Sequence, residues 1–350
     1  MAKPIETTTY ASVDIGSHTV RLLIARVDES GTVEPVRVER RITRLARSFQ
    51  TEGSLHEDGV RASIRVLGEY ADLIASHGVK STACGATGVV RRATDGRRFM
   101  QEVELRTGLS GSILSESAEA FLSAKGVLSV LPRNGMGVLT FDVGGGTTEF
   151  LRVEPSAHVP SWIKSIFLGA SIITERFLRN APAADDALGE ARGAVRRALG
   201  EVMALSRIET AGGGTTFSSW ELVGTAGTVT TLAAMHLRMT PYVPHRVNGV
   251  ALTETWIDST IARLAPMSLA ERRELPGLEE GREDIILGGA LIVHEILLGL
   301  DRARLLAVDA GLLEGLLLDV VEKDIFGRVE LRTPLKWRFP AEPRDRSQPD

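Results

Sequence analysis

The chain has 350 residues, of which 43% are hydrophobic and 25% are charged. These are ordinary proportions for a globular protein, and the length is sufficient for two domains, each with its own core. The net charge of −4 gives no general attraction to nucleic acid or to anionic membranes, so we expect neither as a partner.

The composition also bears on the compartment. Cys84 is the single cysteine, which excludes an internal disulfide and fits a reducing cytoplasm. Residues 1–6 lack the apolar stretch of a signal peptide. The most apolar region, residues 285–300, contains His294 and Glu295 and falls short of a membrane span. We therefore expect a cytoplasmic protein.

The first half of the chain reads as a mixture of strands and helices. Apolar runs at 10–15 and 20–27 predict a hairpin, and Ser54-Leu55-His56-Glu57 predicts a capping box for a helix that Gly78 ends. The later elements are predicted at 79–84 (strand), 97–107 (helix, with Gly108 beyond its end), 112–114 (strand) and 115–131 (helix capped by Ser115 or Ser117). Pro132 to Gly135 then indicates a domain boundary.

The second half repeats this order. A second hairpin is predicted at 138–143 and 147–153, and further elements at 161–168 (strand), 172–178 (helix), 186–205 (helix), 221–223 (strand), 305–308 (strand) and 311–321 (helix). The helix at 186–205 is amphipathic: Leu188, Ala191, Val195, Leu199 and Val202 share one face, whereas Glu190, Arg192, Arg196, Arg197 and Glu201 are expected to face water. Residues 212–214, three glycines, read as a flexible surface loop, and the tail from Lys323 is expected to be poorly ordered.

The most informative feature is a turn that occurs twice, once in each hairpin. Its copies are Asp14-Ile15-Gly16-Ser17 and Asp142-Val143-Gly144-Gly145-Gly146-Thr147. Glycine tolerates a positive φ there, so that backbone N–H groups can turn toward an anion. The aspartates would repel phosphate unless they hold a divalent cation that the phosphate also contacts. The alternative reading of either copy is an ordinary tight hairpin.

These elements predict an α/β protein made of two duplicated domains with an active-site cleft between them. The first domain spans 1–132 with a returning helix at about 309–322, the second spans 136–305, and residues 323–350 form a polar tail. The two turns, together with a third glycine-rich turn at 224–228, resemble the phosphate and nucleoside motifs of the actin/hexokinase/heat-shock chaperone superfamily.

Within that superfamily the chain is similar to the exopolyphosphatase and guanosine pentaphosphate phosphohydrolase family. Five segments, in the family's order, carry the resemblance: residues 12–23, 86–93, 114–120, 141–149 and 224–228. The resemblance implies two actin-like (ribonuclease H-like) domains and Mg²⁺-dependent hydrolysis of terminal phosphoanhydride bonds in polyphosphate, guanosine pentaphosphate or both.

The resemblance also implies roles for individual residues. Glu119 matches the glutamate that activates the attacking water, Glu149 matches a second acidic residue that serves metal binding and water activation, and Arg91 matches the arginine that contacts the phosphate chain. Metal binding is implied for Asp14, Asp142 and Glu149. Phosphate binding is implied for Asp14, Gly16, Ser17, His18, Gly144, Gly145, Gly146, Thr147, Gly224, Gly227 and Thr228. No phosphorylated enzyme intermediate is expected.

Several positions depart from the family pattern. His18 stands where asparagine is common, Glu116 and Ala118 replace a glycine and an acidic residue, and Phe121 stands where arginine is frequent. These changes leave open the balance between polyphosphate and nucleotide and the preferred chain length. The chain also ends without the additional helical domains of longer members, which favours shorter polyphosphate chains or a nucleotide as substrate.

Other readings stay open. Taken alone, Glu119 is an acid in the first turn of a helix, where it would stabilise the helix dipole, and Arg91 belongs to a basic face. The same fold class includes kinases for small acceptors, and a sensor that binds without turnover is a third possibility. The expected partner is a polyanionic phosphate substrate, and a homodimer is possible.

Overall fold

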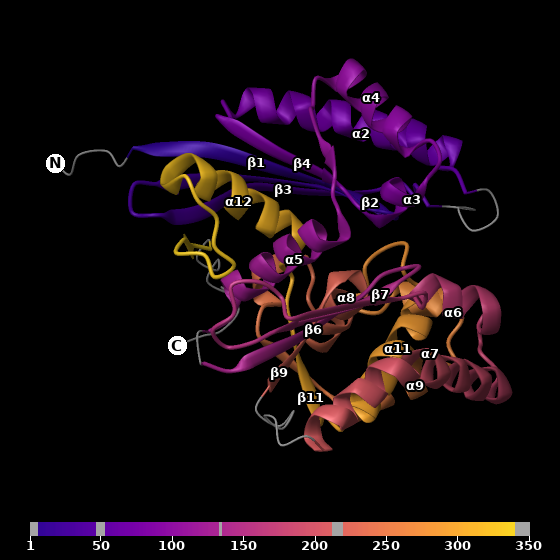
Figure 1. Ribbon diagram of the computed structural model, residues 1–350. Coiled ribbons are helices and arrows are strands. Elements are labelled where there is room, and N and C mark those ends of the chain that lie inside the picture. The colour runs from indigo at the N-terminus through magenta and orange to yellow at the C-terminus, as the bar shows by residue number, and fades with distance from the viewer. Residues whose placement is uncertain (1–5, 47–52, 133–134, 212–219, 340–350) are drawn as a thin grey trace, which may run out of the picture. The chain divides into compact units, whose positions relative to one another are not determined.

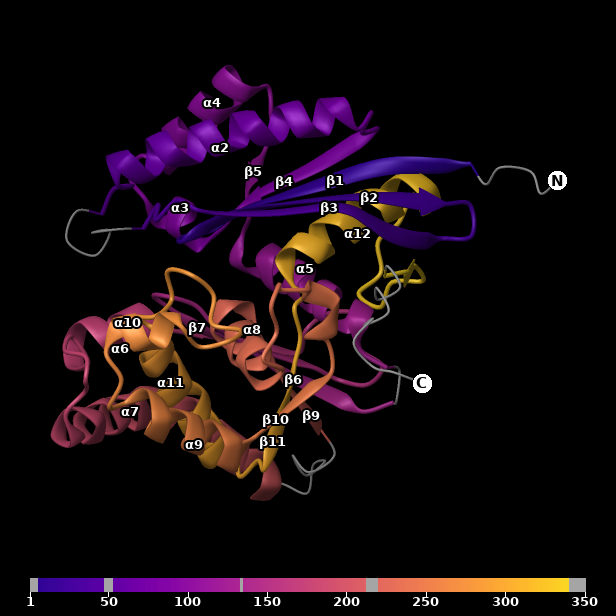
Figure 2. The ribbon, with the colours of Figure 1, turned by 180° about the vertical axis from the view of Figure 1, so that it is seen from behind.

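A computed structural model of the chain describes residues 6–46, 53–132, 135–211 and 220–339. The chain divides into two compact units, one made of residues 1–116 and 316–350 and the other of residues 117–315. Figures 1 and 2 show their elements from opposite sides. The cleft expected between the domains stays a prediction.

The first unit is built on a six-stranded sheet in the order β12-β3-β2-β1-β4-β5. Its elements are β1 (Thr7–Ile15), β2 (Thr19–Asp28), β3 (Thr32–Ile42), α2 (Glu57–Ser76), β4 (Ser81–Ala86), α3 (Gly88–Arg92), α4 (Gly96–Thr107), β5 (Ser112–Ile113), most of α12 (Leu312–Phe326) and β12 (Lys336–Trp337). Strands β1, β2 and β3 form an antiparallel meander. Strand β4 pairs with β1 in parallel, and β5 pairs with β4 in parallel.

Helices cover both faces of the first sheet. Figures 1 and 2 show α2 and α4 on one face and α12 on the other. Val13 and Ile15 of β1 are fully buried and form a core with Leu67 of α2. On the opposite side, the Tyr10 hydroxyl donates to Asp324 of α12 at 2.5 Å. Apolar burial and this hydrogen bond hold the returning helix to the sheet.

The second unit has its own six-stranded sheet, in the order β10-β11-β9-β6-β7-β8. Its elements are most of α5 (Glu116–Val130), β6 (Gly137–Val143), β7 (Thr148–Val153), β8 (Trp162–Ile166), α6 (Ala170–Phe177), α7 (Asp185–Ala211), β9 (Trp220–Thr225), α8 (Ala226–His236), the short η2 (Pro244–Arg246), β10 (Val250–Thr253), α9 (Glu254–Leu264), α10 (Leu269–Arg273), α11 (Ile286–Gly299) and β11 (Arg304–Ala307).

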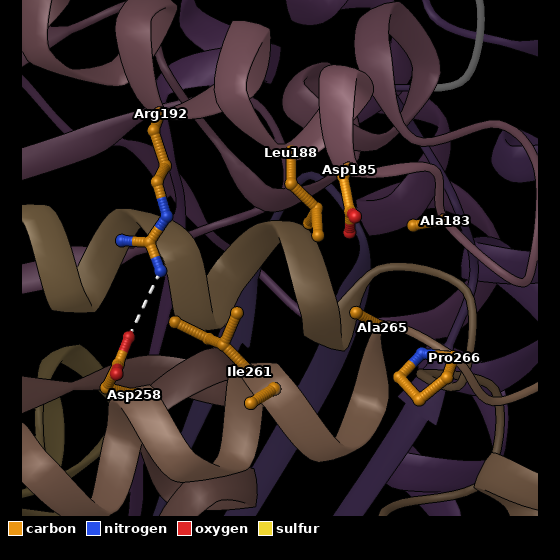
Figure 3. A pocket seen from close by; sticks show the side chains of 9 residues that line it. Ala183, Asp185, Leu188, Arg192, Asp258, Ile261, Ala265 and Pro266 are labelled. Carbon is orange, nitrogen blue, oxygen red and sulfur yellow. Dashed lines mark hydrogen bonds and ion pairs between the residues drawn. The ribbon is translucent and has the colours of Figure 1, made fainter.

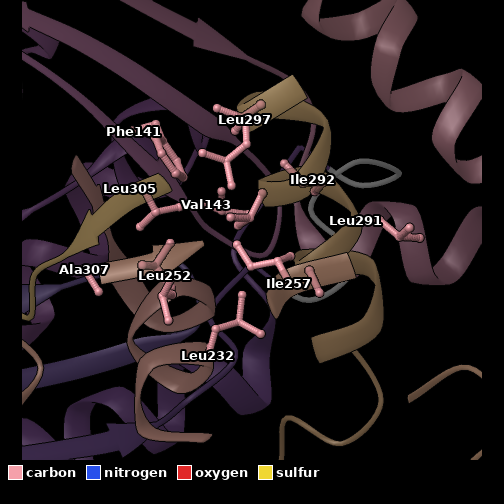
Figure 4. Close-up of a cluster of buried hydrophobic side chains, with 14 of the residues drawn as sticks. Phe141, Val143, Leu232, Leu252, Ile257, Leu291, Ile292, Leu297, Leu305 and Ala307 are labelled. Carbon is pink, nitrogen blue, oxygen red and sulfur yellow. The ribbon is translucent and has the colours of Figure 1, made fainter. Parts of the chain in front are cut away.

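Helix α11 is the centre of the second core. Its residues from Ile286 to Leu297 are buried, and it packs against α6, α7, α8 and α9. Figure 4 shows Leu291, Ile292 and Leu297 of α11 among buried side chains from β6, α8, α9, β10 and β11. The apolar run that stops short of a membrane span is therefore a buried core helix. Among the described residues, no helix combines the length and apolar composition needed to cross a membrane.

The two sheets share one design. The order β3-β2-β1-β4-β5 in the first unit corresponds to β8-β7-β6-β9-β11 in the second, and corresponding pairs run in the same relative directions. The edge strands differ, because β12 adds in parallel to β3 whereas β10 adds antiparallel to β11. This repeat confirms the predicted fold class, an α/β protein of two duplicated actin-like domains.

The division between the units differs from the predicted boundary at 132–136. It falls inside α5, between residues 116 and 117, and inside α12, between 315 and 316. Two glycines explain why the first turn of α12 belongs with α5. A Cβ added at Gly126 would lie 1.9 Å from the Gly311 carbonyl oxygen, and one added at Gly315 would lie 1.9 Å from the Leu122 oxygen, so the backbones are in direct contact.

Two expectations about local structure are wrong, and one is confirmed. Residues 323–339 are not a disordered tail, since α12 continues to Phe326 and β12 pairs with Thr32 and Val33 of β3. The capping box at 54–57 does not form, because His56 is the N-cap of α2 and its side chain makes no capping hydrogen bond. Gly108 does end α4, with a φ of 73°. The glycines at 212–214 and the tail beyond residue 339 lie outside the described residues.

The polar face of α7 is only partly solvated. Its apolar face packs into the core as predicted, but Arg192 and Arg196 both donate to the buried carboxylate of Glu295, at 3.0 and 2.6 Å. Arg192 also donates to His294 at 2.8 Å. The expectation of a solvated side chain is therefore wrong for Arg192, which is 24% exposed, but holds for Arg196, which is 62% exposed and still pairs with Glu295. The carboxylate buried on α11 needs these cationic partners.

Candidate active site

The first turn connects β1 to β2. The Gly16 N–H donates to the Thr19 carbonyl at 3.0 Å, and a Cβ added at Gly16 would lie 3.1 Å from that oxygen. Asp14 stands opposite Arg21 in the strand pair. The Arg21 guanidinium donates to Asp14 Oδ2 from Nε at 3.1 Å and from Nη2 at 2.9 Å. The first turn therefore carries its own counter-charge.

The second turn repeats this backbone geometry between β6 and β7. The Gly144 N–H donates to the Thr147 carbonyl at 3.0 Å, and a Cβ added at Gly144 would lie 3.3 Å from that oxygen. Asp142 occupies the position of Asp14, but its partner across the strands is Glu149. Opposite residues in an antiparallel pair carry Cβ atoms about 5 Å apart. Two half-buried carboxylates thus share one face of the hairpin.

The turn glycines are present for space and not for an unusual φ. None of Gly16, Gly144, Gly145 and Gly146 lies in the left-handed region, which corrects the sequence-based reason for them. A Cβ at Gly145 would lie 3.1 Å from Ser171 Oγ, whereas one at Gly146 would meet nothing within 4 Å. The backbone at Gly146 is therefore open to a ligand.

The carbonyl groups of the second turn are held by helix α6. The Ala170 N–H donates to the Gly144 oxygen and the Ser171 N–H to the Gly145 oxygen, both at 2.9 Å. In the part of the chain that the structure describes, the N–H groups of Gly145 and Gly146 donate to no protein acceptor. With carbonyls engaged and N–H groups available, the turn is suited to binding an anion.

The carbonyl groups of the first turn also accept backbone hydrogen bonds. The Ala46 N–H donates to the Ser17 oxygen at 2.9 Å, and the N–H groups of Thr43 and Arg44 donate to the His18 oxygen at 2.9 and 3.0 Å. The two turns thus present equivalent backbone surfaces. They differ in the charge at their base and in the side chains of Ser17 and His18, which replace two glycines.

The third turn joins β9 to α8. Gly224 is buried, since an added Cβ would lie 2.9 Å from both Phe141 and Val229. Thr225 is the N-cap residue of α8, and its hydroxyl donates to the Ala310 oxygen at 3.0 Å. Ala226 has a φ of 64°, a left-handed conformation that costs about 1 kcal/mol or more for a non-glycine residue. Such strain is typical of functional turns.

Two further residues of this turn contact other elements. Thr228 is 2% exposed, and a Cβ added at Gly289 of α11 would lie 2.5 Å from its methyl carbon. A Cβ added at Gly227 would lie 1.9 Å from Nη2 of Arg282. The Arg282 guanidinium therefore lies directly against Gly227. Sequence reasoning missed Arg282, because it follows Gly227 by more than fifty residues and no local motif marks it.

Glu119 lies in the first turn of α5 and is half-buried, whereas Glu116 and Ser117 beside it are exposed. The helix that carries it belongs to the same unit as the second and third turns. Its Gly126 packs on Gly311, next to the Ala310 carbonyl that Thr225 of the third turn contacts.

Arg91 lies in α3 of the first unit. It is half-buried, unlike its exposed neighbours Arg92, Arg97 and Arg98. Its Nη1 donates to the Leu114 carbonyl at 2.7 Å, which fixes the end of β5 just before the chain enters α5. Arg91 is therefore not simply one of a row of solvated arginines.

The donors fit Mg²⁺ better at the second turn than at the first. No group of three or more His, Cys, Asp or Glu side chains suited to a metal occurs in the described ranges. Mg²⁺ needs only one or two carboxylates when phosphate oxygens complete its shell, and Asp142 with Glu149 supply two. At the first turn, Arg21 occupies Oδ2 of Asp14, although Oδ1 is buried without a hydrogen-bond partner.

A cavity of about 470 Å³ lies elsewhere in the second unit, between α7 and α9. Figure 3 shows its lining, which includes Leu188, Ile261 and the ion pair of Arg192 with Asp258. None of the residues expected to bind phosphate or metal contributes to it. In the second unit, the candidate site is therefore formed by the second and third turns and not by this cavity.

Comparisons with known proteins identify phosphatase relatives of the chain. The chain is 31% identical over 337 residues to Exopolyphosphatase 2 of Mycobacterium tuberculosis, covering 93% of this chain and 98% of that protein. It is 26% identical to the Bifunctional 3-dehydroquinate synthase/phosphatase of Fusobacterium nucleatum, of which it spans only 46%.

Solved structures show the same fold. The Aquifex aeolicus member of the Ppx/GppA family superposes with a TM-score of 0.75 at 28% identity, over 91% of this chain and 99% of that one. An exopolyphosphatase from Cytophaga hutchinsonii gives 0.78 over 93% of this chain and 100% of that one, at 20% identity.

The family model described as the Ppx/GppA phosphatase family matches residues 23–324. This match covers most of the chain and includes the second and third turns, Glu119 and Arg91. It confirms the resemblance and the phosphatase class expected from the motifs. The chain belongs to the Ppx/GppA phosphatase family.

Proposed function

We propose that this protein is a cytoplasmic, Mg²⁺-dependent phosphohydrolase that releases terminal phosphate from inorganic polyphosphate, with guanosine pentaphosphate as the alternative substrate. One observation carries the proposal. Asp142 and Glu149 face each other at the base of a turn whose Gly145 and Gly146 N–H groups meet no acceptor among the residues that the structure describes. The pair supplies ligands for a divalent cation, and the turn supplies donors for a phosphate group.

The chemistry needs little more than positioning and charge. Phosphoryl transfer to water requires the water to lie in line with the leaving oxygen and requires positive charge around the equatorial oxygens. When bound, Mg²⁺ supplies part of that charge. Gly145 and Gly146 donate backbone hydrogen bonds, and the guanidinium forks of Arg91 and Arg282 suit phosphate oxygens.

Glu119 is proposed as the residue that orients the attacking water and accepts its proton. It is half-buried and lies on the helix that packs near the third turn, in the unit that also carries Asp142 and Glu149. Glu149 is proposed to assist. The reaction then needs no nucleophilic side chain, so no phosphorylated enzyme forms. Asp14, Gly16, Ser17 and His18 are proposed as further phosphate contacts.

We propose polyphosphate as the main substrate because the chain matches Exopolyphosphatase 2 along nearly the whole length of that protein. Guanosine pentaphosphate stays the alternative, since Phe121 stands where an arginine would bind a longer phosphate chain. For Asp14, the contact with Arg21 makes phosphate binding through the turn a better proposal than direct metal binding, because a guanidinium repels a divalent cation.

A phosphate-release assay tests the proposal. Short polyphosphate, long polyphosphate, guanosine pentaphosphate and ATP are compared with Mg²⁺ and with EDTA, in the absence of any phosphate acceptor. The proposal predicts release from polyphosphate that EDTA abolishes. Transfer that requires an added acceptor would indicate a kinase. Binding of polyphosphate without release at saturating Mg²⁺ would indicate a sensor.

A further inference from the structure

The loop between α10 and α11 presents Arg282 to the third turn. It packs on both ends of α8. Near one end, Gly277 has a φ of 85°, and an added Cβ would lie 2.2 Å from the Ala234 carbonyl oxygen. At the other end, the Arg282 guanidinium lies against Gly227, and its Nε also donates to Glu279. The Arg282 side chain is 10% exposed, so its direction is set by packing.

A second arginine, Arg272, donates a hydrogen bond to the backbone of this loop. Arg272 is 2% exposed. Its Nη1 donates to the Glu283 carbonyl at 3.1 Å, and its Nε donates to the Leu264 carbonyl at 3.2 Å. Burying a guanidinium costs free energy that two neutral carbonyl partners offset only in part. Arg272 thus fixes the backbone of Glu283, which follows Arg282 directly in the sequence.

The Glu283 side chain also fixes this loop, through an ion pair with Arg273. Its Oε1 accepts from Nε and Nη2 of Arg273, both at 2.7 Å, and the carboxylate is 10% exposed. Burial alone would raise the pKa of Glu283, but hydrogen bonds from its own backbone N–H and from Arg273 outweigh burial and lower it. Glu283 is therefore charged at neutral pH, and the ion pair with Arg273 is fully formed there.

We propose that Arg272 and the Glu283–Arg273 ion pair are positioning residues that keep the Arg282 guanidinium pre-organised against the third turn for a substrate phosphate group. This inference rests on the proposed function. It assigns substrate affinity to side chains that do not themselves contact substrate. A guanidinium fork contributes most when its orientation is fixed before binding, because ordering it afterwards subtracts from the binding free energy.

The test is Glu283→Gln, which keeps the shape of the side chain and removes its charge. We expect KM for tripolyphosphate to rise about ten-fold while kcat stays within about two-fold, because pre-organisation is lost and the chemistry is not. Glu280→Gln is the matched control, since Glu280 is an exposed carboxylate in the same loop, and its KM should equal that of the parent. Arg273→Lys, which keeps the charge but loses the fork, should give an intermediate KM.

The mechanism is separated from general destabilisation by repeating Glu283→Gln in an Arg282→Ala background. If Glu283 acts through Arg282, the second substitution leaves KM unchanged there. An equal rise in both backgrounds, or no rise in the parent background, would overturn the inference. If Glu283→Gln fails to fold, Arg273→Lys and Arg273→Gln in the two backgrounds decide the same question.

Calorimetric binding of tripolyphosphate in EDTA to the parent and to Glu283→Gln gives a readout independent of turnover, with weaker binding expected for the variant. A parent that releases phosphate and a Glu283→Gln variant identical to it would remove only this inference. A parent that neither releases phosphate nor binds tripolyphosphate, even with Mg²⁺, would remove the proposed function and, with it, any phosphate for Arg282 to meet.

Discussion

The first and second turns share one backbone hydrogen-bond pattern but differ in the charges of the residues at their base. Both close with a glycine N–H donated to the threonine carbonyl three residues on, at 3.0 Å. At the same step of the ladder, Asp14 faces Arg21 whereas Asp142 faces Glu149. The first pair is oppositely charged and attractive, whereas the second is like-charged and would favour a bound cation.

The difference in charge suggests different roles for the two copies of the turn. In the first turn, Arg21 already pairs with Asp14, so we propose that this turn contacts phosphate and does not hold the metal ion. The second turn places two carboxylates beside the backbone of Gly145 and Gly146, which suits both a cation and a close phosphate. Substitutions in the two turns test this difference.

The largest effect is expected from Glu119→Gln, in the unit that carries the second turn. Loss of the proposed base should lower kcat by about 10³- to 10⁴-fold, with KM changed little, because the substrate contacts remain. Steady-state phosphate release measures both constants. Glu116→Gln, an exposed carboxylate in the same helical turn, is the control and should retain the parent rate.

Glu149→Gln removes one half of the like-charged pair. We expect kcat to fall about 10²- to 10³-fold and the Mg²⁺ concentration for half-maximal rate to rise, because the cation loses a charged ligand. The free energy of unfolding without Mg²⁺ should stay equal or increase, since a repulsion is relieved. A variant with normal Mg²⁺ dependence would contradict the metal assignment.

Arg21→Gln applies the matching change to the first turn. Asp14 is only 6% exposed and would lose its counter-charge, so the free energy of unfolding should fall by about 2 to 3 kcal/mol. This is the low end for a buried pair because the Arg21 side chain is a quarter exposed. Urea unfolding of Arg21→Gln and Glu149→Gln side by side measures the contrast, and equal stabilities would count against it.

Two glycines give a smaller contrast. Gly16→Ala should lower the free energy of unfolding by about 1 kcal/mol, because the new methyl group lies 3.1 Å from the Thr19 oxygen. Gly146→Ala should leave stability unchanged, since its methyl group meets nothing within 4 Å, and should raise KM by crowding the phosphate. Thermal melts and steady-state kinetics test the pair. An unchanged KM for Gly146→Ala would place the phosphate elsewhere.

The smallest effect concerns Cys84, which pairs with Val13 beside the first turn. Burial, with the nearby Asp14 charge, raises the pKa of its thiol to about 12. The reactive thiolate forms only as pH approaches that value, so the native protein should resist a thiol reagent at pH 8 while the urea-unfolded chain reacts at once. Rapid modification of the native protein would show that this strand opens.

The sequence was informative where the determinants are local. The two aspartate-glycine turns, the end of α4 at Gly108 and the apolar face of α7 depend on neighbouring residues, and the structure agrees with each. The pairing of Asp142 with Glu149 also follows from a four-residue hairpin. These features were therefore within reach of sequence patterns.

The missed features depend on distant contacts. Arg282 meets Gly227 only because the loop after α10 folds back on α8. Strand β12 was read as disordered because Lys336 and Trp337 form a strand only through Thr32 and Val33, three hundred residues earlier. Arg192 was expected to be solvated because nothing in α7 signals the buried Glu295 on α11. Such contacts leave no local pattern.

The central claim is that the Asp142–Glu149 pair holds the cation that drives phosphate release. The most direct measurement is a Mg²⁺ titration of phosphate release from tripolyphosphate by the parent and by Asp142→Asn, with EDTA as the zero point. The account predicts no release in EDTA, saturable activation of the parent, and a loss of about 10²-fold or more for Asp142→Asn at all Mg²⁺ concentrations tested. Undiminished release in EDTA, or a parent-like titration for Asp142→Asn, would contradict it.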